Sequence, residues 1–139
     1  MKSTRVVYLI LGSAEKEHQL DEKTQRNTWA QNLYQPTIWL KGAGETSFDV
    51  KNRNLFVNIK ESYKNILEKT RLGIEWCANN LDFDYLVRGN VSTYFRTENI
   101  KEYLSERRKE GLFLGGYIDV FNAAEEDFKV NYVNGGAIF

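Results

Sequence analysis

Glu61-Ser62-Tyr63-Lys64-Asn65-Ile66-Leu67-Glu68-Lys69-Thr70 opens the stretch of sequence that decides the fold, and Asp84-Tyr85-Leu86-Val87-Arg88 closes it. The first run begins a helix that we expect to extend from Glu61 to about Asn80. Its apolar positions recur mostly at steps of three or four, which predicts an amphipathic helix. They are Tyr63, Ile66, Leu67, Thr70, Ile74, Cys77 and Leu81. Gly73 weakens a helix interior, so we expect a close packing contact there.

The second run is a short apolar strand that stops at the polar sequence Gly89-Asn90-Val91-Ser92-Thr93. The continuous apolar run 6–11 predicts another strand, buried on both faces as in a parallel sheet. In open α/β sheets, ligands gather at the carboxyl ends of the strands. Gly12-Ser13 follows the run 6–11, and Asn90 and Ser92 follow the strand at 85–87. The sequence therefore predicts a ligand site at these two strand ends.

The remaining elements complete an α/β order. Apolar runs predict strands at 37–40, 55–59, 112–114 with a continuation at 117–121, and 128–133. A weak helical pattern covers about 20–33 with Asp21 as its N-cap, and a second one runs from Glu98 to about Lys109 with Thr97 as its cap. The polar residues 45–54 predict a loop. Alternating helices and strands favour a mostly parallel sheet with helices on both faces.

Composition excludes several classes of function. The chain has 139 residues, enough for one domain over residues 1–139. Its formal net charge is zero, which gives no electrostatic attraction for nucleic acid or for anionic lipid. Cys77 and His18 are the single Cys and the single His, so neither an internal disulfide nor a His/Cys zinc site can form. We interpret Cys77 as a small buried hydrophobe.

The two ends of the sequence suggest a location and a possible extension. No secretory signal and no apolar run of membrane-spanning length is present, so we expect a cytoplasmic protein without a membrane partner. Ala137-Ile138-Phe139 resembles the opening of another buried element, which suggests that the chain is a fragment of a longer domain, incomplete at its C-terminus. An unpaired last strand would be an exposed edge that favours a homodimer.

Several pieces of the chain resemble one family of enzymes. Gln25-Arg26-Asn27-Thr28-Trp29 resembles the Arg-x-Thr-Trp motif of the β-1,3-galactosyltransferase and Fringe-like glycosyltransferases. The run 61–70 resembles their Asp-Ser-Tyr-x-Asn-Leu-Thr-x-Lys-Thr helix, and Trp76 follows at the family's spacing. The run 85–88 is similar to the strand that precedes their Lys-Thr-Asp-Asp-Asp metal motif. Residues 132–137 resemble their Tyr-x-x-Gly-x-Gly-Tyr segment.

This resemblance implies a GT-A fold, which is a Rossmann-like nucleotide-sugar domain. The implied activity is transfer of a sugar from a UDP-sugar to a glycan or another hydroxyl acceptor. Mn²⁺, held by an Asp-x-Asp motif, would neutralise the diphosphate. The implied nucleotide-binding residues are Gly12, Ser13, Arg26, Lys69, Arg88, Asn90 and Ser92. Gly135 and Gly136 would lie on the acceptor side.

The chain departs from the family at the metal motif. Asn90, Val91 and Ser92 stand where the family has three acidic residues. Their neutral oxygens attract a divalent ion far less than carboxylates do, whereas Arg88 could contact a phosphate directly. No residue of this chain is assigned as the catalytic base. Three interpretations stay open: a glycosyltransferase, a GT-A-like domain that binds a nucleotide or sugar without turnover, and an unrelated Rossmann-like domain that matches the family by chance. For the strand end alone, a polar turn that binds nothing is the further alternative.

Overall fold

The computed structural model describes residues 4–31, 36–112, 118–122, 129–133 and 137–138. The helices are α1 (Lys16–Asn27), α2 (Ile66–Asn80) and α3 (Thr97–Ser105), with short 3-10 turns η1 (Trp29–Gln31) and η2 (Tyr63–Asn65). The strands are β1 (Val6–Leu11), β2 (Thr37–Ala43), β3 (Ser47–Asp49), β4 (Asn54–Asn58), β5 (Tyr85–Asn90), β6 (Ile118–Asn122), β7 (Lys129–Val133) and β8 (Ala137–Ile138).

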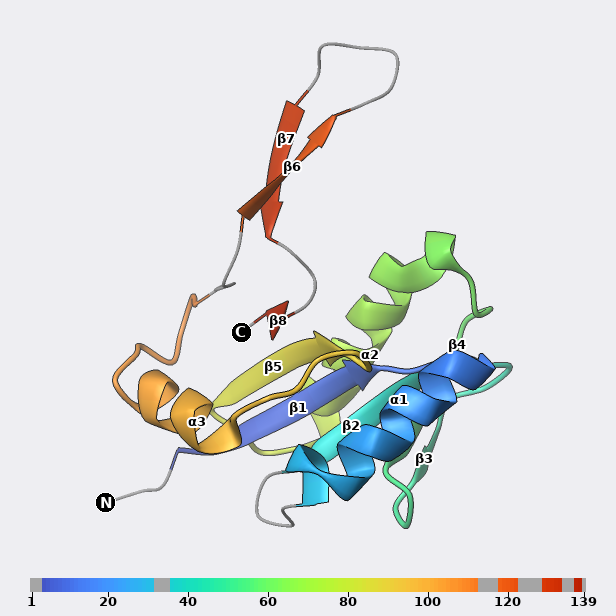
Figure 1. Cartoon of the computed structure of the whole chain (residues 1–139), viewed down its shortest axis with the longest axis horizontal. Helices are drawn as coiled ribbons and strands as arrows, with labels where there is room; N and C mark the ends of the chain where they lie inside the picture. Colours follow the sequence, from blue (N-terminus) through green and yellow to red (C-terminus); the bar gives the residue numbers. More distant parts are fainter. Residues whose placement is uncertain (1–3, 32–35, 113–117, 123–128, 134–136, 139) are drawn as a thin grey trace.

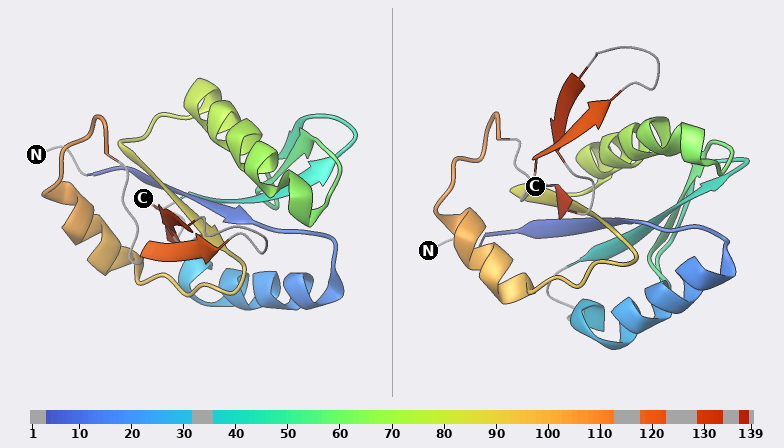
Figure 2. Two further views of the ribbon diagram at one scale, coloured as in Figure 1. Left: turned by 90° about the horizontal axis from the view of Figure 1, so that it is seen from above. Right: turned by 45° about the horizontal axis from the view of Figure 1, so that its top comes forward.

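Six of these strands form one sheet in the order β3-β4-β2-β1-β5-β8 (Figure 1). The four inner strands are parallel, and the two edge strands, β3 and β8, pair antiparallel with their neighbours. Helices α1 and α3 cover one face of the sheet and α2 covers the other (Figure 2). The prediction of a mostly parallel α/β sheet with helices on both faces is therefore confirmed.

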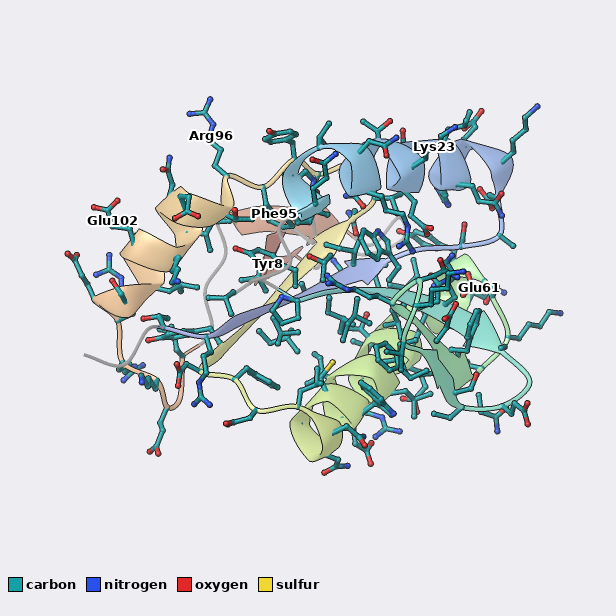
Figure 3. All side chains as sticks on the ribbon, turned by 90° about the horizontal axis from the view of Figure 1, so that it is seen from below. Tyr8, Lys23, Glu61, Phe95, Arg96 and Glu102 are labelled. Atoms are coloured by element: carbon teal, nitrogen blue, oxygen red, sulfur yellow. The ribbon has the colours of Figure 1, made fainter. Side chains whose placement is uncertain are left out.

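Strand β1 lies at the centre of the sheet because its side chains are buried in both directions. Tyr8 and Ile10 belong to the core beneath α1 and α3, and Val7 and Leu9 belong to the core beneath α2. Burying each large apolar side chain contributes about 1.5–3 kcal/mol. Tyr8 and Phe95 point toward one another in the first of these cores (Figure 3), with ring centroids 5.4 Å apart.

The chain order reverses at β1. From β1 the chain passes through α1 to β2 on one side, whereas β4 leads through α2 to β5 on the other side. Such a point in an open parallel sheet leaves a crevice outside the carboxyl ends of the two diverging strands. This crevice lies beyond Leu11 and Asn90, which are opposite one another in the β1–β5 register.

A buried glutamine joins α1 to both sides of the sheet centre. Gln25 accepts the indole N–H of Trp39 on β2 at 3.0 Å. Its amide nitrogen donates to the backbone oxygens of Asn90 and Thr93, both at 3.0 Å. Because all of these groups are satisfied, a polar residue can occupy the core. The bonds also fix the path of the chain directly after β5.

The structure corrects several predicted helix bounds. Helix α1 begins at Lys16 after the N-cap residue Glu15 and ends at Asn27, so Asp21 lies inside it rather than at its start. Helix α3 begins with Thr97, one residue after its N-cap, and ends at Ser105 rather than near Lys109. Both helices carry few apolar residues, which leaves their ends weakly marked in the sequence.

Helix α2 turns a different face to the sheet from the one that its apolar residues predict. Tyr63 and Leu67 are 90% and 82% exposed, whereas Lys69, Gly73 and Cys77 are buried. The expected packing contact at Gly73 is present: a Cβ there would lie 2.6 Å from Cδ2 of Leu40. The missing side chain lets this face approach the sheet closely, and it brings Lys69 inside. Cys77 is a buried free thiol, as predicted.

Other differences concern the sheet edges and the last part of the chain. The predicted loop 45–54 contains β3, whose Phe48 ring packs 4.8 Å from Trp76 on α2. Leu112 is not in a strand, and residues 113–114 lie outside the described residues. Strands β6 and β7 pair with one another as an antiparallel hairpin. Ala137 and Ile138 form a strand that pairs with Gly89 and Arg88.

Candidate functional site

A cavity of about 810 Å³ opens at the carboxyl ends of β1 and β5. It has the size and the place in the fold that small-molecule sites of α/β proteins have. Three separate segments line it: the end of β1 with the start of α1, the segment that leads into α2, and the end of β5. The lining residues are Leu11, Gly12, Ser13, Ala14, Glu15, Glu17, His18, Asp21, Glu61, Ser62, Tyr63, Ile66, Lys69, Asn90, Val91 and Ser92.

The first wall is the turn between β1 and α1. The N–H of Gly12 donates to the backbone oxygen of Leu40 at 2.9 Å, which keeps the turn against β2. Oγ of Ser13 accepts the N–H of Glu15 at 3.2 Å and lies 2.6 Å from Nδ1 of His18. These bonds hold the hydroxyl and the imidazole side by side at the beginning of α1. The wall thus presents one hydroxyl and one titratable ring to the cavity.

The floor of the cavity contains an ion pair between a buried lysine and a partly exposed glutamate. Nζ of Lys69 lies 2.7 Å from Oε1 of Glu61 and donates to the backbone oxygen of Gly12 at 2.6 Å. Oε1 of Glu61 also accepts the N–H of Gly42, at the end of β2. Burial lowers the pKa of the Lys69 ammonium, and Glu61 opposes this shift. Glu61 lies where β1 ends and α1 begins (Figure 3).

Gly42 is required for this arrangement. A Cβ at this position would lie 2.6 Å from the backbone oxygen of Ile59 and 2.8 Å from Oε1 of Glu61. No real Cβ atom approaches backbone that closely, so a larger residue would push the carboxylate out of its place. Gly42, near the end of β2, therefore helps to position Glu61.

The third wall follows β5. Asn90 is the last residue of the strand, and the N–H of Thr93 donates to its backbone oxygen at 3.0 Å to close a turn. Val91 is buried in the core under α1 and α3, whereas Ser92 is exposed. Gln25 fixes the two carbonyl groups of this turn, as described above. The cavity therefore meets a neutral amide and a neutral hydroxyl at this wall.

Five of the residues predicted for nucleotide binding come together here: Gly12, Ser13, Lys69, Asn90 and Ser92. Arg88 is buried and is not among the lining residues; burial lowers the pKa of its guanidinium. Gly135 and Gly136 lie outside the described residues.

Arg26 also lies outside the cavity lining. Its guanidinium carbon sits 3.8 Å from the centroid of the Trp39 ring, and its nitrogens donate to the Asn52 backbone oxygen at 2.6 Å and to Asn54 Oδ1 at 3.1 Å. It also pairs with Glu22 one turn earlier in α1. These contacts fasten α1 to the start of β4. The resemblance placed this arginine near the nucleotide, whereas the structure gives it a role in helix packing.

The sequence did not single out His18 or Glu61 as residues of the site. The charged run that contains His18 carries no mark of a ligand site, and the His18 side chain is 45% exposed at the cavity wall. Glu61 stood within the quoted run 61–70, but its partner Lys69 lies eight positions further on. That spacing matches no pairing on one helix, because helical neighbours are three or four residues apart. The pair forms because Glu61 precedes the helix and folds back over it.

The cavity is electrostatically uneven. Glu15, Glu17 and Asp21 give its α1 side three exposed carboxylates. Glu15 is the N-cap residue of α1 and Glu17 lies in its first turn, where the helix dipole stabilises negative charge, whereas Asp21 lies one turn further along. The buried ammonium of Lys69 stands on the floor. A ligand with an anionic end and a hydroxyl-rich end would be oriented by this difference.

The site does not fit the divalent cation that the resemblance implies. At the position of the family's acidic motif the chain offers the Asn90 amide and the Ser92 hydroxyl, and hard cations prefer carboxylates. Within the described ranges, no three His, Cys, Asp or Glu side chains gather in a way that could hold a metal ion.

Comparison with known proteins leaves the chain without an assigned family. No protein-family model matches the sequence, and no curated protein matches it. In the part of the chain that the structure describes, no helix combines the length and the apolar character that a membrane crossing requires.

Proposed function

We propose that this chain binds a UDP-sugar in the cavity beyond β1 and β5 and transfers the sugar to a hydroxyl acceptor. One observation carries the proposal. The turn Gly12-Ser13, the segment from Glu61 to Lys69 and the strand end Asn90–Ser92 are far apart in the sequence, yet they line one cavity at the switch point of the sheet. These segments include most of the run 61–70, which resembles a helix of glycosyltransferases of β-1,3-galactosyltransferase type, and the strand end that stands at the position of their metal motif.

The chemistry of the walls suits such a ligand. The volume of about 810 Å³ is within the range of small-molecule sites. In the transfer step, the bond between the anomeric carbon and the diphosphate oxygen breaks, and its electron pair leaves with UDP. The acceptor oxygen forms the new bond to that carbon. The exposed carboxylates Glu15, Glu17 and Asp21 form the α1 wall of the cavity. One of them, such as Glu17 or Asp21, can take the proton from the acceptor hydroxyl.

A second candidate function is binding of a nucleotide or sugar without turnover. The neutral Asn90-Val91-Ser92 sequence at the acidic-motif position favours it, because the usual means of stabilising the leaving diphosphate is absent there. The two candidates share the cavity and differ in whether UDP is released. Incubating the chain with a UDP-sugar and a hydroxyl acceptor, and measuring free UDP over time, separates them.

Calorimetric titration tests the shared part of both candidates. UDP, UDP-galactose and UDP-N-acetylglucosamine are titrated in EDTA and again in Mn²⁺, with ADP as the comparison nucleotide. Ser92→Trp places a large ring in the cavity mouth and should abolish binding. Ser105→Trp, on exposed α3, should leave binding unchanged. If neither the uridine nucleotides nor ADP bind to the unmodified chain in either buffer, both candidate functions are wrong.

A further inference from the structure

Lys69 is an almost fully buried cation with capacity for one more partner. Lys69 is 5% exposed, and its Nζ contacts two acceptors in the described part of the chain, the backbone oxygen of Gly12 and Oε1 of Glu61. An ammonium carries three N–H donors. Buried donors are nearly always satisfied, because an unsatisfied one loses its hydration without compensation. Since Lys69 also lines the cavity, a ligand oxygen can take the third donor.

The surrounding charges favour an anionic oxygen at this place. Burial lowers the pKa of the ammonium, and Lys41 and Arg88 lower it further through their positive charges. Glu61 is the one carboxylate paired with it among the described residues, and that oxygen is shared with the N–H of Gly42. Lys41 in turn pairs with Glu22, 3.0 Å away. A bound phosphate oxygen would therefore relieve the unfavourable environment of the Lys69 charge.

The carboxylates of the α1 wall strengthen the preference for an anionic oxygen at Lys69, because they repel a phosphate from their own side of the cavity. These exposed carboxylates, Glu15, Glu17 and Asp21, disfavour a phosphate on that side and can accept hydrogen bonds from sugar hydroxyls instead. An anionic group is thus directed away from α1 and toward the floor, where Lys69 stands. Because these carboxylates are exposed, salt screens their effect more than it screens the buried ammonium.

We propose that Lys69, held in place by Glu61, binds a phosphate oxygen of the nucleotide sugar directly, so that binding requires no divalent cation. Lys69 is then the binding residue, and Glu61 is a positioning residue that acts through it. This inference rests on the proposed function, since it concerns the same cavity. It explains how a site whose strand end carries Asn90 and Ser92 instead of carboxylates can still hold a diphosphate.

The first experiment uses the unmodified chain and needs no substitution. UDP and uridine are titrated calorimetrically in EDTA and in Mn²⁺. We expect UDP to bind with dissociation constants that agree within about twofold in the two buffers, and more tightly than uridine, which lacks the phosphates. If UDP binds only in Mn²⁺, this inference is wrong while the proposed function stands. If neither UDP nor uridine binds in either buffer, the proposed function itself fails.

The second experiment removes the cation. Glu61→Gln combined with Lys69→Met replaces the ion pair by neutral groups of similar size, and the Gln oxygen can still accept the Gly42 N–H. We expect UDP affinity to fall by at least about tenfold, the effect of one lost charge-assisted hydrogen bond, with uridine affinity unchanged. Lys64→Met removes an exposed lysine outside the cavity lining and should change neither. Unchanged UDP affinity in the double variant would overturn the inference.

Glu61→Gln alone tests the positioning role. The carboxylate raises the pKa of Lys69 against the effects of burial, Lys41 and Arg88. Without it, the ammonium should lose its proton at a lower pH, so UDP binding should decline at a lower pH than in the unmodified chain. Uridine affinity should not follow this change. A pH profile of UDP binding identical to that of the unmodified chain would show that Glu61 does not act through Lys69.

Discussion

For Gly73→Ala, helix propensity predicts that the free energy of unfolding rises, whereas the packing in the structure predicts that it falls. In an exposed helix interior, alanine is more favourable than glycine by about 1 kcal/mol. At Gly73, however, a Cβ would lie 2.6 Å and 3.0 Å from the two methyl groups of Leu40, and 3.2 Å from Cδ2 of Leu9. Optimal carbon–carbon separations are about 3.5–4.0 Å. Both leucines are fully buried, so neither can move aside freely.

The expected change in the free energy of unfolding combines the gain in helix propensity and the cost of the close contacts. An extra methyl group forced into a packed core costs typically about 1–3 kcal/mol. The shortest contact, to a fully buried side chain, places Gly73→Ala toward the upper part of that range. After the gain in helix propensity is subtracted, we expect the free energy of unfolding to fall by about 1–2 kcal/mol.

Urea denaturation followed by tryptophan fluorescence measures this change. Ala78→Gly, at an exposed position of the same helix, should lower the free energy of unfolding by about 1 kcal/mol and calibrates the propensity of α2. In a Leu40→Ala background the space opens, and Gly73→Ala should become stabilising. Stabilisation by Gly73→Ala in the unmodified chain would refute the close approach of α2 to β2.

Three further predictions concern buried polar groups and the thiol. Burial raises the pKa of the Cys77 thiol to about 12, so at pH 8 it should react with an aromatic disulfide reagent only at the rate of unfolding; fast reaction in the native state would contradict its burial. The Arg5 backbone N–H, and then its guanidinium, hold the pKa of Asp84 well below its usual range. The ionised Asp84 therefore stabilises the fold above the unfolded-state pKa near 4, and this stabilisation is lost as the pH falls. Asp84→Asn should lower the free energy of unfolding at pH 7 by about 2 kcal/mol. In this variant the free energy of unfolding should also depend less on pH in the acid range. Gln25→Leu leaves the indole N–H of Trp39 without its Gln25 acceptor and removes one donor from each of the backbone oxygens of Asn90 and Thr93, and we expect a loss of about 2–3 kcal/mol, measured by urea denaturation; a change below about 0.5 kcal/mol would show that water replaces the amide.

The centre of the sheet could be predicted from the sequence because a strand that is buried on both faces has a continuous run of apolar residues. The apolar run 6–11 becomes β1, and the shorter apolar runs become β2, β4 and β5. The strand-end rule for parallel sheets then places Gly12-Ser13 and Asn90–Ser92 in one cavity, as observed. Predicting these strands and the site at their ends required only the local composition and the order of elements along the chain.

The face of α2 could not be predicted in the same way. Its apolar residues suggested Tyr63 and Leu67 as core positions, yet both are exposed and Lys69 is buried, although Gly73 and Cys77 pack as the sequence predicts. A lysine is buried only when it finds partners, and those of Lys69 come from the end of β1 and from the segment before the helix. Such a pairing depends on the tertiary fold, so a periodicity of apolar residues contains no sign of it.

The place of β1 in the sheet has a consequence for the order of events during synthesis. Its neighbour β2 follows after α1 and η1, but its other neighbour, β5, begins 79 positions later along the register that joins Val6 to Tyr85. At ribosomal rates of about 5–20 residues per second, one edge of β1 waits roughly 4–16 s for its partner. During that interval a run of six apolar residues presents unpaired backbone to other nascent chains. A chaperone that shields this first strand would therefore act before β5 is complete.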